Sequence, residues 1–247
     1  MSSSIRGRNR VTVPAAAKPL VSRIGRLAES RRMHAYAVGG CVRDWLLGIR
    51  RTEDLDVTVE GGGIEVAEAV GRALRGTLTV HRQFGTATLL LPGRVRGRID
   101  FATCRRETYA RPAAYPRVEP GTLHDDLFRR DFTINAMAAA IAPSGFGTLI
   151  DPFRGRADLA RRMLRVLHDR SFLDDPSRIL RGIRFRHRFA LRWEAGTARL
   201  LREALRAGAL GWLNRGRLQK ELERMGGEPE PLACLRELAG RLGGAAR

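Results

Sequence analysis

Short stretches in which apolar residues recur at every second position mark the first part of the chain. This period sends alternate side chains to opposite faces and is typical of strands. It predicts strands at 35–40 (AYAVGG), 55–60 (LDVTVE) and 97–104 (GRIDFATC). The stretch 77–93 predicts two more strands, which a Phe-Gly pair joins.

Longer stretches have apolar residues three and four positions apart, which is the period of a helix with one buried face. They predict helices at 18–33, 41–48, 64–75 and about 124–139. The segment 105–122 is rich in proline and shows neither period, so we predict a long loop there, of the kind that often carries function.

Strand signals fade after about residue 156, while the density of arginine rises. We therefore predict an α+β fold in which a mixed sheet with flanking helices is followed by an all-helical part. The predicted division is a basic N-terminal arm at 1–25, a mixed domain at 26–158 and a helical domain at 159–247.

The charge of the chain points to its partner. The 247 residues include 43% hydrophobic positions, enough for a sizeable core, and carry a formal net charge of +19. Only Lys18 and Lys220 are lysines, and the arginine guanidinium offers a planar fork for phosphates and base edges. A genome rich in G and C explains the preference for arginine but not the net charge. A nucleic acid or nucleotide is therefore the favoured partner.

Cysteine usage and hydropathy exclude several classes of protein. Cys41, Cys104 and Cys234 lie far apart, without the spacing of a zinc site or a disulfide framework. No apolar run approaches the length of a membrane span, and the N-terminus lacks the apolar core of a signal peptide. We predict a protein of the reducing cytoplasm with no membrane partner.

Two acids stand two positions apart in the stretch TEDLDVTVE. Residues i and i+2 of a strand share a face, so Asp54 and Asp56 project together. Their charges repel each other unless a cation lies between them, and carboxylate oxygens suit Mg²⁺. A third acid, Asp100, lies in the strand predicted at 97–104, and pairing of the two strands would bring it alongside. Taken alone, the acid pair is also compatible with a solvated strand end.

The stretch VGGCVRD joins a predicted strand to a predicted helix just upstream. Gly39 and Gly40 let the backbone approach an anion closely, and the helix start offers free N–H groups to it. Arg43 adds a charged donor one turn into the helix. An ordinary tight turn is the alternative, but with the acidic strand downstream the arrangement is typical of a triphosphate held over metal ions.

Four motifs follow one another in a fixed order: VGGCVRDWLLG…EDLDVTV, LFRRDFTINAMA (127–138), LIDPFRGRADL (149–159) and FLDDPSRILRGIRFRHRF (172–189). Together they resemble the motifs of the class II tRNA nucleotidyltransferase and bacterial poly(A) polymerase family, over about residues 35–225. The resemblance implies a polymerase-β-like catalytic head and a helical neck. It also implies Mg²⁺-dependent addition of CMP or AMP, from CTP or ATP, to an RNA 3′ end, with the tRNA acceptor stem as partner.

The resemblance assigns roles to single residues. Asp54 and Asp56 would hold two metal ions, and Asp100 occupies the position of the third carboxylate. The Gly-Gly turn and Arg43 would lie against the triphosphate.

The second motif would surround the sugar and the phosphates. Arg130, Asp131 and Asn135 would lie near one face of the helix predicted at about 124–139. Arg130 would then bind the nucleotide, while Asp131 and Asn135 would hold the ribose hydroxyls. A helix-capping role for Asp131 is the alternative.

The fourth motif would select the base. Asp175 would accept a hydrogen bond from the amino group of cytosine or adenine, and Arg178 would donate to the ring nitrogen. Uracil and guanine reverse this pattern and leave both side chains unpaired. Arg181 and Arg184 would contact phosphates or the base. Without the other motifs, a basic solvated helix face would be the simpler interpretation.

Members of this family add CCA, CC or A to tRNA, or make poly(A) tails, and they share all of these motifs. The sequence therefore predicts addition to the tRNA 3′ end but leaves the product open. A non-catalytic RNA-binding module with the same fold is the alternative of another class, and the intact acids and arginines of the motifs argue against it.

Overall fold

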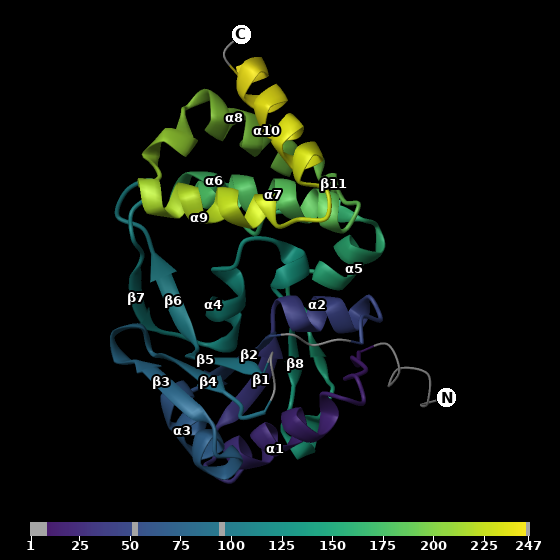
Figure 1. Ribbon diagram of the computed structural model, residues 1–247, viewed down its shortest axis with the longest axis vertical. Coiled ribbons are helices and arrows are strands. Elements are labelled where there is room, and N and C mark those ends of the chain that lie inside the picture. Colours follow the sequence, from purple (N-terminus) through teal and green to yellow (C-terminus); the bar gives the residue numbers. More distant parts are fainter. Residues whose placement is uncertain (1–8, 51–53, 94–96, 246–247) are drawn as a thin grey trace. The chain divides into compact units, whose positions relative to one another are not determined.

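The computed structural model describes residues 9–50, 54–93 and 97–245 (Figure 1). Contacts within the chain divide it into two compact units. Unit 1 comprises residues 1–107, 118–130 and 135–156, and unit 2 comprises residues 108–117, 131–134 and 157–247. The domain boundaries after residues 25 and 158 stay predictions.

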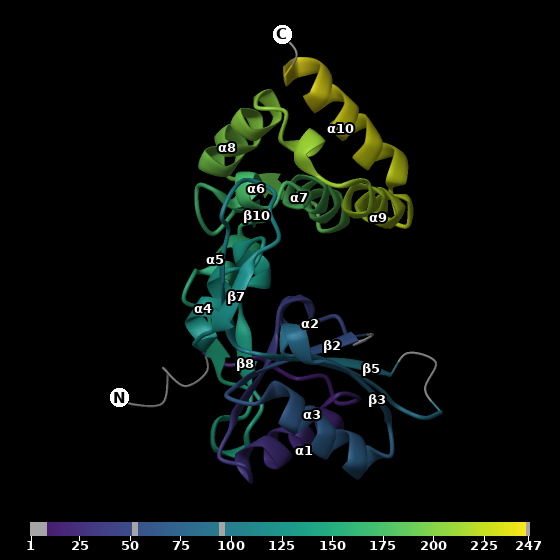
Figure 2. The same ribbon diagram turned by 90° about the vertical axis from the view of Figure 1, so that its left-hand side faces the viewer.

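A mixed sheet forms the centre of unit 1, with the strand order β3-β4-β5-β2-β1-β8-β9 (Figures 1 and 2). The central pair β2 and β5 is parallel, and the other neighbours are antiparallel. The strands predicted from the period of two are confirmed. The members of the sheet are β1 (His34–Val38), β2 (Asp54–Glu60), β3 (Thr77–His81), β4 (Thr86–Leu90), β5 (Arg98–Thr103), β8 (Ala138–Ala140) and β9 (Leu149–Ile150).

Helices cover both faces of this sheet. Figure 2 shows α1 (Lys18–Glu29) and α3 (Gly63–Leu74) on one face, with α2 (Gly40–Leu46) on the other. The apolar stripes of α1 and α3 are buried against the strands, as their period predicted. Two short 3₁₀ turns, η1 (Arg82–Phe84) and η3 (Pro143–Gly145), complete the connections.

The prediction of a long loop at 105–122 is wrong, because this segment contains a two-stranded sheet of β6 (Arg105–Thr108) and β7 (Arg117–Pro120). All four residues of β7 are exposed, so no alternation of apolar residues marks it in the sequence. Its proline, Pro120, stands in an edge strand, which is where sheets tolerate proline.

The long helix predicted at about 124–139 is also wrong. A capping box between Thr122 and Asp125 starts α4 (Leu123–Phe128), which ends after six residues. The chain continues through the 3₁₀ turn η2 (Thr133–Asn135) into β8. Residues 131–139 are all buried, and a helix would have presented part of this run to solvent. An added Cβ on Gly25 of α1 would meet the carbonyl oxygen of Ile141, so the helix lies directly on the extended backbone after β8.

Unit 2 is mainly helical. The helical spacing of Ile179, Leu180 and Ile183 puts them on one side of α7, and all three are fully buried. The pair β10–β11 is a small departure from the all-helical prediction. The elements of this part are α5 (Gly155–Ala160), β10 (Met163–Leu164), α6 (Ser171–Asp174), α7 (Ser177–Arg188), β11 (Arg192–Trp193), α8 (Ala195–Arg206), η4 (Ala209–Trp212), α9 (Arg215–Gly226) and α10 (Pro231–Ala245).

The predicted N-terminal arm is held in place along the part that the structure describes. Val11 and Val13 are buried, and the Val11 N–H donates to the carbonyl oxygen of Gly147. Residues 1–8 of this arm lie outside the described residues. Among the helices described here, none combines the length and the apolar character needed to cross a membrane.

Candidate active site

Two neighbouring strands bring the three predicted acids to one face of the sheet. In the parallel register of β2 and β5, Asp56 stands opposite Asp100 and Asp54 stands opposite Arg98. Because residues two positions apart share a face, Asp54, Asp56 and Asp100 lie on the same side. The spacing within β2 was visible in the sequence, and the strand register adds Asp100 to the pair.

The electrostatics of Asp56 make this face a candidate cation site. Burial raises the pKa of Asp56 above its ordinary value, and the charges of Asp100 and Asp54 raise it further. The cation of Arg130 acts in the opposite direction, but the pKa stays raised. A second positive charge beside these carboxylates would relieve their repulsion.

The carboxylate of Asp100 is engaged with other side chains. It accepts a hydrogen bond from the Thr88 hydroxyl at 2.6 Å and forms an ion pair with Arg98 at 2.8 Å. Within the described ranges, no group of three or more acids, histidines or cysteines is placed to hold an ion together. Asp54 and Asp56 therefore offer the carboxylate oxygens that suit a hard divalent cation, and Asp100 has to leave Arg98 to join them.

The absence of a side chain at Gly39 leaves the space that an arginine occupies. The residue has φ of +73°, and an added Cβ would lie 2.7 Å from Nη1 of Arg130. The Arg130 guanidinium thus lies over the Gly-Gly turn, near Asp56, and its Nη2 donates to Asp126 at 3.1 Å. Its Nε is buried and has no hydrogen-bond partner among the described residues. The turn therefore needs glycine both for its backbone conformation and for the space that Arg130 fills.

Arg43 faces the interior of unit 1. Its Nη1 donates to Oδ1 of Asn135 at 2.6 Å, and its Nε donates to Asp44 at 2.9 Å. Its side chain is only 7% exposed, so in this arrangement it orders the second motif and is largely shielded from solvent. Gly40 opens the helix that carries it.

The predicted shared helical face of Arg130, Asp131 and Asn135 is wrong, since none of the three lies in an α-helix. Asn135 belongs to unit 1 with Arg43, while Asp131 belongs to unit 2. Nε and Nη2 of Arg181 both donate to Oδ2 of Asp131, at 2.9 and 2.6 Å. Asp131 is thereby tied to α7, the helix of the fourth motif.

Asp175 stands between α6 and α7, just before the helix that Ser177 begins. Its Oδ1 accepts from the backbone N–H of Ser177 at 3.0 Å and from Arg217 Nη2 at 2.6 Å. Arg178 comes within 4.0 Å of its Oδ2 and donates to the Ser171 hydroxyl at 2.7 Å. The structure thus brings the two predicted base-reading side chains together.

Arg184 does not fit the role predicted for it. Its side chain is buried, with Nη1 donating to Glu221 at 2.9 Å and Nε donating to Glu228 at 2.8 Å. Two carboxylates neutralise this arginine and join α7 to α9 and to the turn before α10. The helical spacing of the fourth motif puts Arg184 on the side opposite the apolar stripe, but it does not show that two acids from later in the chain cover that side. Arg184 is a packing residue of unit 2.

Sequence reasoning missed the role of Arg217. No motif in the sequence connects this residue with the base-reading pair, whereas the structure turns it toward Asp175, 42 positions away. The Asn that caps α9 three residues earlier was the only local signal, since it fixes where the helix begins and which way its first turn faces.

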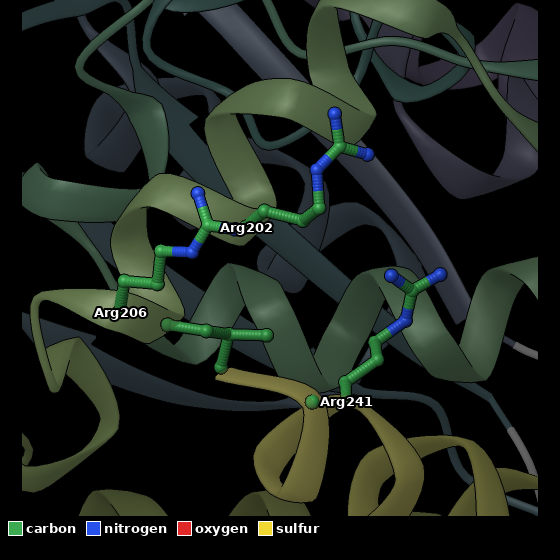
Figure 3. Close-up of a pocket in the computed structure, with 5 residues that line it drawn as sticks. Arg202, Arg206 and Arg241 are labelled. Carbon is green, nitrogen blue, oxygen red and sulfur yellow. The ribbon is translucent and has the colours of Figure 1, made fainter. Parts of the chain in front are cut away.

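A basic hollow of about 160 Å³ lies between α8 and α10, outside all predicted site residues. Figure 3 shows Arg202 and Arg206 from α8 and Arg241 from α10 around it. Arg241 is paired with Glu237, whereas Arg202 and Arg206 have no acidic partner among the described residues. Leu205 supplies part of the apolar lining. Such a hollow attracts anions.

The fold and the site together define a class. A family model described as the poly A polymerase head domain matches residues 35–165. This chain belongs to that family, and the resemblance seen in the four motifs is confirmed. The family implies a divalent metal, which the carboxylate pair of β2 fits.

The similarity extends to particular proteins. The chain is 48% identical over 193 residues to the A-adding tRNA nucleotidyltransferase of Aquifex aeolicus, covering 77% of this chain and 23% of that protein. It is 42% identical over 203 residues to the CC-adding tRNA nucleotidyltransferase of Deinococcus radiodurans, covering 82% of this chain and 52% of that protein. Its structure is similar to that of the Thermotoga maritima CCA-adding enzyme complexed with tRNA, with a TM-score of 0.81 and 44% sequence identity. The similarity covers 93% of this chain and 52% of the Thermotoga chain.

The chain spans about half the length of the Deinococcus and Thermotoga proteins, and less than a quarter of the Aquifex protein. The Aquifex and Deinococcus proteins are thus similar to the chain in sequence, and the Thermotoga protein is similar to it in both sequence and fold.

Proposed function

We propose that this protein is a template-independent RNA nucleotidyltransferase that adds CMP, AMP or both to the 3′ end of tRNA. The observation that carries the proposal is the shared face of Asp54 and Asp56 on β2, with Asp100 opposite Asp56 on β5. Relatives that add A and relatives that add CC are similarly close, so the product is a matter for experiment. Residues 26–158 would form the catalytic head and residues 159–247 the neck.

The proposed metal is Mg²⁺, held by Asp54 and Asp56. When bound, it supplies the positive charge that activates the 3′-hydroxyl and neutralises the leaving pyrophosphate. Burial raises the pKa of Asp56 despite the nearby cation of Arg130, and the charges of Asp100 and Asp54 add to it, which supports a further positive charge at this carboxylate. Asp100 would complete the group after exchanging Arg98 for the cation.

The chain's own residues would hold the triphosphate and the sugar. The Arg130 guanidinium, which lies over the Gly-Gly turn near Asp56, would bind phosphate oxygens. The Gly-Gly turn and Arg43 would support it. Asp131, fixed by Arg181, and Asn135, fixed by Arg43, would bind the ribose hydroxyls. The 3′-hydroxyl would lose its proton to water, and its oxygen would form a bond to the α-phosphorus while the bond from that phosphorus to the bridging oxygen breaks and pyrophosphate leaves.

Base selection would fall to Asp175 and Arg178. The Oδ2 atom of Asp175 can accept from the amino group of cytosine or adenine, and Arg178 can donate to the adjacent ring nitrogen. Uracil and guanine present an acceptor where Asp175 needs a donor, and an N–H where Arg178 needs an acceptor. These side chains would replace a nucleic-acid template.

The RNA would be held mainly through its phosphates. A net charge of +19 and the hollow of Arg202 and Arg206 favour backbone contacts over base reading. A protein that uses tRNA and nucleoside triphosphates would work in the cytoplasm, where we place this one.

The test is a series of incubations of the purified protein with Mg²⁺ and each nucleoside triphosphate separately. Three tRNA transcripts would be used, which lack the whole CCA end, lack only the terminal A, or are complete. Addition of CC, of A, of CCA or of a long A tail would identify the product. Absence of addition to every transcript, in a protein that still binds tRNA, would favour a non-catalytic RNA-binding module.

A further inference from the structure

The two carboxylate oxygens of Asp175 have different surroundings. Oδ1 accepts three hydrogen bonds, from the Ser177 N–H at 3.0 Å, the Ser177 hydroxyl at 2.5 Å and Arg217 Nη2 at 2.6 Å. Oδ2 accepts none from the described residues and lies 4.0 Å from Nε of Arg178. One oxygen is saturated, and the other remains available to a ligand beside Arg178.

Arg217 is itself held from several sides. Its helix begins at a cap in which Asn214 Oδ1 accepts from the Arg217 N–H. Its Nη1 donates to the carbonyl oxygen of Ala113 at 3.4 Å, and its guanidinium lies 5.9 Å from the ring centroid of Tyr115. The Tyr115 hydroxyl in turn accepts from the Asn214 side chain. The segment between β6 and β7 thus fixes the direction from which Arg217 reaches Asp175.

We infer that Arg217 is a specificity-determining positioning residue, which holds Asp175 so that only Oδ2 is presented to the base. This inference rests on the proposed function, because it assumes that Asp175 reads the base. Arg217 acts through Asp175, so it is not a catalytic residue.

The physical consequence concerns the wrong bases. Uracil and guanine carry a ring N–H that a carboxylate can accept if the base shifts sideways. Saturation of Oδ1 leaves no second acceptor position for such a shifted base. Without Arg217, the two Ser177 donors remain, but the charged donor is lost and Oδ1 regains accepting capacity. A shifted uracil or guanine would then find a partner.

The test compares Arg217→Gln, Arg217→Lys and a matched control, Arg215→Gln. Arg215 lies on the same helix and is exposed. Its substitution by glutamine removes the same charge, but at a position without a contact to Asp175. For each variant, kcat/KM would be measured with the cognate nucleotide and with UTP and GTP on one tRNA substrate. Equilibrium binding of all four triphosphates would be measured in parallel, together with the melting temperature.

We expect Arg217→Gln to lower discrimination against UTP and GTP by about tenfold, mainly through a higher kcat/KM for the wrong nucleotides. Arg217→Lys should keep part of the discrimination against UTP and GTP, because lysine keeps the charge but cannot reach Asp175 and Ala113 together. Arg215→Gln should discriminate as the unmodified protein does.

Loss of rate by the same factor with all four nucleotides would overturn the inference, since that is the signature of a merely structural role. Failure of the proposed function looks different, because the unmodified protein would then add no nucleotide to any tRNA. In that case the binding measurement decides. A preference for CTP or ATP that Arg217→Gln abolishes would sustain the inference, and equal binding of all four triphosphates would overturn it.

Discussion

Asp131 and Arg181 are joined through a single oxygen atom, since Nε and Nη2 of the arginine both donate to Oδ2 of the aspartate. The other oxygen, Oδ1, accepts from the backbone N–H of Phe132 at 2.8 Å. The acid that would recognise the ribose is therefore anchored to the helix that would recognise the base. Sugar and base recognition would be coupled within unit 2.

This coupling predicts the effect of Asp131→Ala. The variant should lower discrimination between ribo- and deoxyribonucleotides, because the acceptor for the ribose hydroxyl is gone. It should also lower the free energy of unfolding by about 1–2 kcal/mol, because Arg181 loses its hydrogen-bonded partner. The measurement is kcat/KM with ATP against dATP, or CTP against dCTP.

Asp169→Asn is a suitable control for that experiment, because Asp169 is an exposed acid of the same unit. An unchanged ratio of ribo- to deoxyribonucleotide use in Asp131→Ala would show that the ribose is recognised elsewhere.

Gly39→Ala should damage the site through Arg130. The substitution places a methyl group 2.7 Å from Nη1 of Arg130, and it puts a side chain on a backbone with φ of +73°. We expect a loss of about 1–3 kcal/mol in the free energy of unfolding. The KM for the nucleotide should rise because Arg130 is displaced.

Gly48→Ala separates the two effects in that prediction. Gly48 has a similar φ of +75°, but an added Cβ meets nothing within 4 Å. This variant should lose stability to a similar extent and keep its KM. An equal rise of KM in both variants would show that Arg130 is not the cause.

The carboxylate of Glu237 should make the free energy of unfolding depend on pH. Its carboxylate accepts from Trp193 Nε1 at 3.0 Å and Arg241 Nε at 2.8 Å, and from Arg186 and His187 on α7. Burial acts to raise the pKa of Glu237, but these donors outweigh it, so the pKa lies below its ordinary value of 4.5. The stabilisation is therefore fully present above pH 4.5 and is lost as the pH falls through the lowered pKa.

Glu237→Gln should accordingly lower the free energy of unfolding by about 1–3 kcal/mol at pH 7. The difference from the unmodified protein should shrink as the pH falls below 4.5, where the unfolded chain takes up the proton first, and should disappear below the lowered pKa of the folded protein. Urea unfolding at several pH values provides the measurement. A difference that is the same at pH 3.5 and pH 7 would contradict the assignment of this stabilisation to the carboxylate charge.

The basic hollow predicts the salt dependence of RNA binding. The double variant Arg202→Gln and Arg206→Gln should weaken tRNA binding and reduce the slope of log K against log salt concentration by about 1–2 units. Nucleotide selectivity should be unchanged, because these arginines lie on α8 and not among the predicted nucleotide-binding residues. Exposed Arg199 and Arg192 offer a control pair with the same change of charge. An identical slope in both double variants would remove any special role from the hollow.

Local patterns predicted much of the fold and of the candidate site. The period of two predicted the central strands, the i, i+2 spacing placed Asp54 and Asp56 on one face, and the buried stripes of α1 and α3 followed from their helical period. The neighbourhood of Asp175 and Arg178 followed from their separation of three residues. Each of these features depends on residues that lie close together in the sequence.

The wrong predictions concern features that depend on residues far apart in the sequence. The run 131–139 contains good helix formers, but burial on all sides and the close approach of α1 hold its end in a strand. Arg184 is neutralised by Glu221 and Glu228, and Arg217 reaches Asp175 across 42 positions. No local pattern reports such partners, because they depend on how α7, α9 and the turn before α10 pack together.

The central claim is that the carboxylates of β2 carry out nucleotide addition. It is tested most directly by single-turnover incorporation of labelled AMP and CMP into tRNA, with Mg²⁺ present, by the unmodified protein and by Asp54→Asn and Asp56→Asn. Glu68→Gln on α3 removes one charge from the opposite side of the sheet and serves as the control. The account predicts full incorporation by the unmodified protein and the control, and none by the two aspartate variants, all with the same circular dichroism spectrum. Normal incorporation by a folded Asp54→Asn or Asp56→Asn protein would contradict it.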